Sequence, residues 1–171
     1  LHKTEKIIHQ DLKFFPLDKE YHQNIICANA LQTDWATLVT KDKLCYIIGN
    51  PPFVGTKYQS PAQKADIINL CKALKPLDYV TGWYYKASEF IQDTKIECAF
   101  VSTNSIAQGE QVAPLWKVLN VNINFAYRTF KWQSESESMA AVHCVIIGFA
   151  VKSRRKKFIY VGEEKIPAQN I

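Results

Sequence analysis

The 171-residue chain contains only six glycines, and none of them belongs to a glycine-rich cluster of the kind that cradles phosphates. It also lacks any apolar run near the roughly 20 residues that a membrane helix needs, so we expect no membrane partner. The first ten residues, LHKTEKIIHQ, do not have the order of charged, apolar and small residues found in a signal peptide. Because the chain begins with Leu1 rather than Met, we expect it to be a piece of a longer protein.

The five cysteines show no metal-binding spacing, and their number is odd. They are Cys27, Cys45, Cys71, Cys98 and Cys144. Since no CxxC pair occurs and most of them lie in apolar runs, we expect buried, reduced thiols in a cytoplasmic protein. The four histidines are dispersed as well, so the sequence predicts no metal site.

The composition is that of a folded domain, with 47% apolar and 22% charged residues. The length fits one domain that can bury a core. The net charge of +5 is concentrated late in the chain, above all in KSRRKK at residues 152–157. Such a run is more often a solvated surface than a binding site, although it is compatible with phosphate contacts.

Apolar stretches of strand length alternate with helical patterns. We expect strands at 24–31, 43–49 and 96–106, helices at 61–74, 77–92 and 109–119, and two consecutive strands at 121–132 and 139–152. Ser60 and Pro61 are typical of the N-cap and first residue of the helix that follows them. The alternation predicts an α/β fold with a mostly parallel sheet, helices on both faces, and an antiparallel hairpin at one edge.

Ligands of such sheets bind beyond the carboxyl ends of the strands. Asn50 follows the strand at 43–49, and two consecutive prolines and Phe53 come next. Each proline fixes its own φ and has no N–H, and it holds the preceding residue extended, so Asn50-Pro51-Pro52 is a stiff projection rich in acceptors. A bound amino group could donate one hydrogen to the Asn50 side chain and the other to the Pro51 carbonyl. Phe53 offers a flat face for an aromatic ring.

At these residues the chain resembles the class I S-adenosylmethionine-dependent methyltransferases that modify exocyclic amino groups, whose hallmark is (D/N/S)PP(Y/F/W) after the fourth strand. Three longer stretches narrow the likeness, which runs from about residue 20 to 150. NALQTDW at 29–35, GNPPFVGTKYQS at 49–60 and VSTNSIAQGEQV at 101–112 resemble the N6-adenine DNA methyltransferase domain of single-chain restriction–modification enzymes of types IIG and IIL.

The resemblance implies S-adenosylmethionine as cofactor and an adenine flipped out of double-stranded DNA as substrate. It places Asn50, Pro51, Pro52 and Phe53 at the reacting amine. It further assigns Asn29, Ala30 and Trp83 to the cofactor's adenine pocket, although Trp83 is equally typical of a core aromatic.

Around the target base, the resemblance assigns Ser102, Thr103 and Asn104 to one side, unless they merely cap their strand. It expects an aromatic residue on the far side, where Met139 stands in this chain. Phe130 or Trp132 could reach across instead.

Two family elements have no counterpart here: the FxGxG cofactor loop and the acidic residue that holds the cofactor ribose. We therefore expect a Rossmann-like methyltransferase sheet that lacks its first strands. Residues 1–151 would be the later part of the catalytic domain, and the basic segment 152–171 would lead toward a DNA-recognition domain. The cofactor loop, that recognition domain and possibly a nuclease domain would lie elsewhere in the parent chain. The fragment alone would be inactive.

Two other functions stay open. Related enzymes with NPPY methylate the side-chain amide of a protein glutamine at N5, and the acceptor pair suits that amine as well. The chain could also be a non-catalytic nucleic-acid-binding module that kept the fold. The blocks at 49–60 and 101–112 favour DNA, and the intact Asn-Pro-Pro-Phe favours an enzyme.

Overall fold

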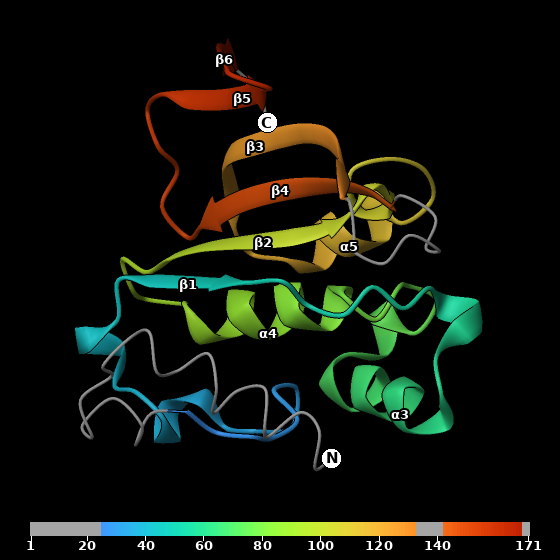
Figure 1. The fold of residues 1–171 in the computed structure, drawn as a ribbon. Coiled ribbons are helices and arrows are strands. Elements are labelled where there is room, and N and C mark those ends of the chain that lie inside the picture. The colour runs from blue at the N-terminus through green and yellow to red at the C-terminus, as the bar shows by residue number, and fades with distance from the viewer. Residues whose placement is uncertain (1–24, 133–141, 169–171) are drawn as a thin grey trace, which may run out of the picture.

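The computed structural model describes residues 25–132 and 142–168, with only the backbone at 131 and 132. A six-stranded sheet runs through them, and helix α4 lies directly beneath β1 and β2 in Figure 1. The strands are β1 (Tyr46–Gly49), β2 (Glu97–Thr103), β3 (Asn122–Trp132), β4 (Val142–Ala150), β5 (Lys157–Val161) and β6 (Glu164–Ala168). The α-helices are α3 (Pro61–Leu70), α4 (Thr81–Phe90) and α5 (Val112–Val118). None of the helices in these ranges is long and apolar enough to cross a membrane.

The strands lie in the order β1-β2-β4-β3-β5-β6. β1 pairs parallel with β2 and β3 with β5, whereas the other three pairings are antiparallel. The α/β class is thus confirmed, although the sheet has more antiparallel pairings than expected. The hairpin of β3 and β4 is antiparallel as predicted, but it lies inside the sheet rather than at its edge. The reason is that residues 157–168, expected to lead away, form a second hairpin and join the sheet beside β3.

Helix α3 begins as the sequence predicts. The Ser60 hydroxyl accepts a hydrogen bond from the backbone N–H of Gln63 at 3.2 Å, and the Gln63 side chain accepts one from the backbone N–H of Ser60 at 2.9 Å. This reciprocal capping box, with Pro61 as the first helical residue, satisfies donors that a helix start leaves free.

The core lies between α4 and one face of the sheet. The ring of Tyr84 packs 5.3 Å from Phe100 of β2 and 5.4 Å from Phe149 of β4, and all three side chains are buried. Trp116 of α5 also contacts Tyr84, at 5.8 Å between ring centroids, so α5 covers the same face as α4. In the ranges described, the helices expected on both faces therefore occupy one face.

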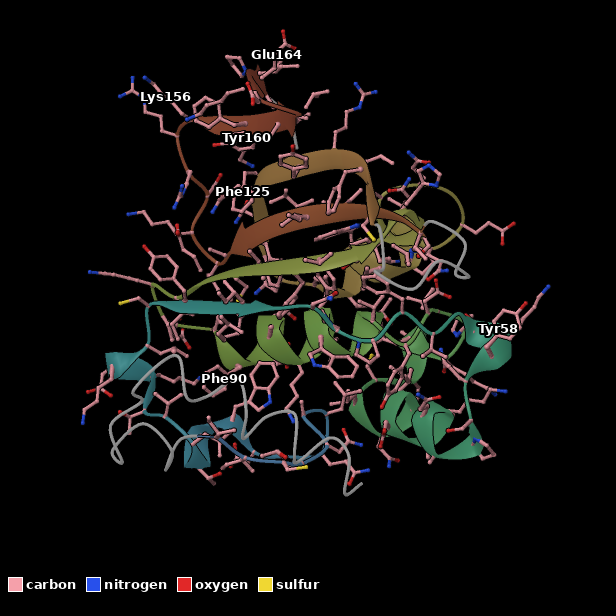
Figure 2. The ribbon with its side chains drawn as sticks, viewed as in Figure 1. Tyr58, Phe90, Phe125, Lys156, Tyr160 and Glu164 are labelled. Atoms are coloured by element: carbon pink, nitrogen blue, oxygen red, sulfur yellow. The ribbon has the colours of Figure 1, made fainter. Side chains whose placement is uncertain are left out.

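The opposite face is covered near β4 by an aromatic ring rather than a helix. A Cβ atom at Gly148 would lie 1.9 Å from the ring of Phe125, so β4 needs glycine where this ring crosses it. Phe125 in turn packs edge-on against Tyr160 of β5, with ring centroids 6.2 Å apart (Figure 2).

Residues 25–31 do not form the strand predicted at 24–31. Ile25 and Ile26 are 67% and 54% exposed, and no strand of the described ranges lies beside them. An apolar stretch becomes a strand only where a neighbouring backbone accepts its hydrogen bonds. The cysteine prediction is also partly wrong: Cys98 and Cys144 are buried, but Cys27 and Cys45 are exposed.

A buried carboxylate holds the segment around Asn29 against the helices. Asp66 of α3 accepts hydrogen bonds from the side chains of Asn29 at 2.9 Å, Gln32 at 2.7 Å and Tyr79 at 2.7 Å. Burial by itself raises the pKa of Asp66, but these three donors outweigh burial and bring its pKa below the usual value. Burial and the adjacent carboxylate raise the pKa of Tyr79 to about 12.

We predict that Asp66→Asn lowers the free energy of unfolding by about 2 kcal/mol at neutral pH, because one amide oxygen cannot serve three buried donors. Since the folded pKa of Asp66 lies below its unfolded value, the stabilisation is complete above about pH 4 and is lost as the pH falls through the folded pKa. Urea unfolding at pH 7, 5 and 3 should therefore give the same difference in free energy of unfolding between the wild type and Asp66→Asn at pH 7 and pH 5. The difference should be smaller at pH 3. Asp42→Asn is the control: Asp42 is exposed and has no hydrogen-bond or ion-pair partner among the described residues, so this change should have little effect at any pH. An undiminished difference at pH 3 would contradict the account.

Candidate active site at one rim of the sheet

The residues that follow β1 lie at one end of the sheet. Because β1 and β2 are parallel and β4 is antiparallel to both β2 and β3, the carboxyl ends of β1, β2 and β3 share this end, which we name the carboxyl rim. Asn50 is exposed there, and its side chain has no hydrogen-bond partner among the described residues. Pro51 is buried and Phe53 is half-buried. The Asn50 amide is thus available to a ligand on a backbone that Pro51 anchors.

The loop after Phe53 is fixed to the start of α4. The carbonyl oxygen of Val54 accepts a hydrogen bond from the backbone N–H of Tyr79 at 2.9 Å. The carboxylate of Asp78 accepts two more from Thr56, from the backbone N–H at 2.9 Å and from the hydroxyl at 3.2 Å. These bonds across more than twenty residues fix the backbone directly after the Asn-Pro-Pro-Phe stretch.

Asn104 lies at the carboxyl rim as expected. Its side-chain oxygen accepts a hydrogen bond from the Thr129 hydroxyl of β3 at 3.1 Å, which joins the ends of β2 and β3. The Thr103 hydroxyl bonds with that of Ser105 at 2.7 Å. Both side chains are half-buried, and the side-chain N–H groups of Asn104 have no hydrogen-bond partner among the described residues.

Ser102 does not face the rim. It is fully buried, and its hydroxyl lies 2.8 Å from the hydroxyl of Tyr84 on α4. Side chains alternate along β2, and Cys98, Phe100 and Ser102 all point toward the helices. The expected contact between Ser102 and a substrate is therefore corrected to a structural hydrogen bond, and burial raises the pKa of its partner Tyr84.

The carboxyl end of β3 brings the candidate aromatics to the rim. Phe130 is half-buried and packs edge-on against Tyr127, with ring centroids 5.6 Å apart. Trp132 pairs through its backbone with Val142, but its side chain lies outside the described part, as does all of Met139. Which of them closes the far side of a base pocket stays a prediction.

The predicted cofactor residues come together from separate segments. Trp83 of α4 is half-buried and packs edge-on against Tyr79 at 5.1 Å, and Tyr79 shares the Asp66 carboxylate with Asn29. The Asn29 oxygen accepts from the backbone N–H of Leu31 at 2.9 Å, which fixes the turn. The carbonyl oxygen of Ala30 accepts the indole N–H of Trp35 at 2.9 Å.

Sequence reasoning missed three residues that hold this arrangement: Asp66, Tyr79 and Lys86. The Lys86 ammonium donates to the carbonyl oxygens of Leu31 and Thr33, and burial lowers its pKa. One signal was present, since Asp66 directly precedes the apolar pair at 67–68 within a helical pattern. An acidic residue beside a buried stripe needs partners, although the sequence does not say which.

The basic run lies away from this site. Arg154 forms an ion pair with Glu97, the first residue of β2, while Asn104 follows its last residue. A strand of 7 residues is about 20 Å long, so residues 152–157 sit at the opposite end of the sheet from the carboxyl rim.

Two comparisons with known proteins match most of the chain. The profile of the family described as MmeI, DNA-methyltransferase domain, matches residues 2–161. The chain is 38% identical over 157 residues to DNA methyltransferase A of Bacillus subtilis (strain 168), covering 86% of this chain and 18% of that protein.

Two solved structures are similar. The type IIL restriction–modification enzyme MmeI in complex with DNA superposes with a TM-score of 0.81 at 50% identity, over 86% of this chain and 22% of that one. A modification subunit from Vibrio vulnificus YJ016, assigned to a type I restriction enzyme, has a TM-score of 0.56 at 14% identity over 78% and 28% of the two chains, which shows a shared fold alone.

The chain spans about a fifth of the length of DNA methyltransferase A and of MmeI. Because the family profile covers all but the first residue and the last ten, the chain belongs to the MmeI DNA-methyltransferase domain family.

Proposed function

We propose that the longer protein containing this chain transfers a methyl group from S-adenosylmethionine to the N6 amino group of an adenine flipped out of double-stranded DNA. The observation that carries the proposal is the exposed Asn50 amide, which has no partner in the described part of the chain and lies on a proline-stiffened loop at the carboxyl rim. Family membership and the likeness to MmeI, solved with DNA, support DNA as the substrate. With DNA as substrate, we also propose a cytoplasmic location.

Asn50 and Pro51 have the chemistry to make the amine reactive. The nitrogen lone pair of adenine N6 is delocalised into the ring, so the free amine is a poor nucleophile. If the Asn50 side-chain oxygen and the Pro51 carbonyl each accept one N–H, they favour a more tetrahedral nitrogen, which binds the transition state better than the planar ground state. Pro52 keeps the backbone rigid, and Phe53 would stack on the base.

In this proposal, the described residues would hold one end of the cofactor. The turn at Asn29 and Ala30 is fixed by Asp66 and Leu31, and the indole of Trp83 packs against Tyr79 of the same cluster, which supports a place for the cofactor's adenine beside these residues. S-adenosylmethionine supplies an electrophilic methyl on a sulfonium. The methionine end would need a glycine-rich loop, which the sequence lacks, so that part belongs to a segment outside this chain.

Two alternative functions can be distinguished from this proposal by experiment. Protein glutamine N5-methylation would use the same acceptor pair, and a non-catalytic module would use neither acceptor. Incubating the full-length protein with tritiated cofactor and either adenine-containing duplexes or protein separates them. Label in protein alone would end the DNA proposal, and label in neither would favour the non-catalytic module.

In the full-length protein, Asn50→Ala should lower kcat for methyl transfer by about 10²- to 10³-fold, because one of the two acceptors is removed. DNA affinity, measured by fluorescence anisotropy, should change less than about threefold. Asn69→Ala, at an exposed position of α3, is the matched control and should keep activity. Persisting activity in Asn50→Ala would show that Asn50 does not hold the amine.

The isolated 171-residue chain should bind S-adenosylmethionine weakly or not at all, because it contains at most one end of the pocket. Isothermal titration calorimetry of the chain against the cofactor checks this expectation. A dissociation constant in the micromolar range would show that the missing elements are not needed.

A further inference from the structure

A short helical turn beside the catalytic loop presents an aromatic ring to solvent. Tyr58 is the last residue of η3 (Thr56–Tyr58), and its side chain is 85% exposed. Figure 2 shows it at the margin of the molecule, pointing away from the sheet. Lys57, beside it, is exposed as well.

The backbone beneath this ring is firmly held. The N–H of Tyr58 donates to the carbonyl oxygen of Gly55 at 2.8 Å, and the side chain of Gln59, which is 5% exposed, donates to the carbonyl of Leu77 at 2.9 Å. The Thr56–Asp78 bonds fix the other end of the turn. A ring with two rotatable bonds on a fixed backbone loses little entropy when it binds a partner.

The surroundings of Tyr58 combine polar and apolar side chains. It lines a hollow of about 670 Å³ together with Lys57 and with Ser105 and Gln108, which follow β2 at the carboxyl rim. Two carboxylates, Asp78 and Glu110, also line the hollow, and Asp78 is engaged by Thr56. None of the other large apolar side chains found exposed in the described ranges belongs to this lining. The apolar part of the lining is Pro76, Leu77 and Pro114, and Leu77 is buried, so Tyr58 is the one exposed large apolar side chain that this lining offers to a protein segment.

Tyr58 instead suits a partner that offers both flat rings and negative charge. Arg128 of β3 is a second exposed cation at the carboxyl rim. β1 and β3 are separated by three strand spacings, about 14 Å, which matches about four base steps along a DNA strand. A DNA strand that runs along the carboxyl rim past Asn50 would thus meet Arg128 on β3, and Lys57 and Tyr58 on the turn after β1.

We propose that Tyr58 and Lys57 bind the DNA strand that carries the target adenine, with the Tyr58 ring stacked on a base next to the flipped one and Lys57 at an adjacent phosphate. The proposal rests on the proposed function, because it needs the target base at Asn50. It adds a contact surface outside the Asn-Pro-Pro-Phe stretch.

The test measures the dissociation constant of the full-length protein for a fluorescent duplex that contains the site the protein methylates. Tyr58→Ala and Tyr58→Leu should each raise the dissociation constant about tenfold, because leucine keeps apolar area but has no ring to stack. Tyr58→Phe should restore the affinity to within about threefold. Unchanged binding by Tyr58→Ala would overturn the proposal, and so would full rescue by Tyr58→Leu, which would indicate packing against a protein segment.

Salt dependence tests Lys57 separately. Lys57→Gln should reduce the slope of log affinity against log salt concentration by about one, whereas Lys64→Gln, an exposed lysine of α3, should leave it unchanged. Equal slopes in the two variants would show that Lys57 does not contact a DNA phosphate. Methyl label on a base other than adenine would contradict the proposed function while leaving these binding results intact, so the two failures can be told apart.

Discussion

Tyr79 forms two hydrogen bonds that join parts of the chain far apart in sequence. Its hydroxyl donates to the buried Asp66 carboxylate, which holds Asn29 and Gln32, and its backbone N–H donates to Val54 in the loop after Phe53. A single residue, Tyr79, which precedes α4, therefore positions both the candidate cofactor turn and the candidate catalytic loop. A buried carboxylate is stable only when its acceptors are filled, so the position of Tyr79 depends on the same carboxylate that holds Asn29 and Gln32.

The direction of the strands gives the two ends of the sheet different chemistry. The carboxyl rim gathers amides, hydroxyls and aromatic rings, whereas the Arg154–Glu97 pair and the rest of the basic run lie at the other end. The strongest concentration of positive charge in the sequence is thus not where the target base would bind. In the proposed complex, single cations such as Lys57 and Arg128 would balance the phosphates at the rim.

The outer edge of β1 has no neighbouring strand in the described ranges. β1 pairs only with β2, and Tyr46 and Ile48 are 65% and 78% exposed beside an apolar hollow of about 350 Å³. An exposed apolar edge strand is a template for further pairing. Together with a chain that spans about a fifth of DNA methyltransferase A and of MmeI, this edge agrees with the proposal that other segments complete the sheet and the pocket.

The sequence alone determined features that depend on neighbouring residues: the α/β class, the capping box at Ser60, and the stiff Asn-Pro-Pro-Phe stretch after β1. Local sterics and short-range hydrogen bonds decide these. Only the tertiary structure decided that 25–31 is no strand, that Ser102 points toward Tyr84, and that Asp66 gathers three donors. Each of these depends on which distant backbone or side chain packs against the segment, or on which face of the sheet the helices cover. The periodicity of a single segment encodes neither the packing partner nor the covered face.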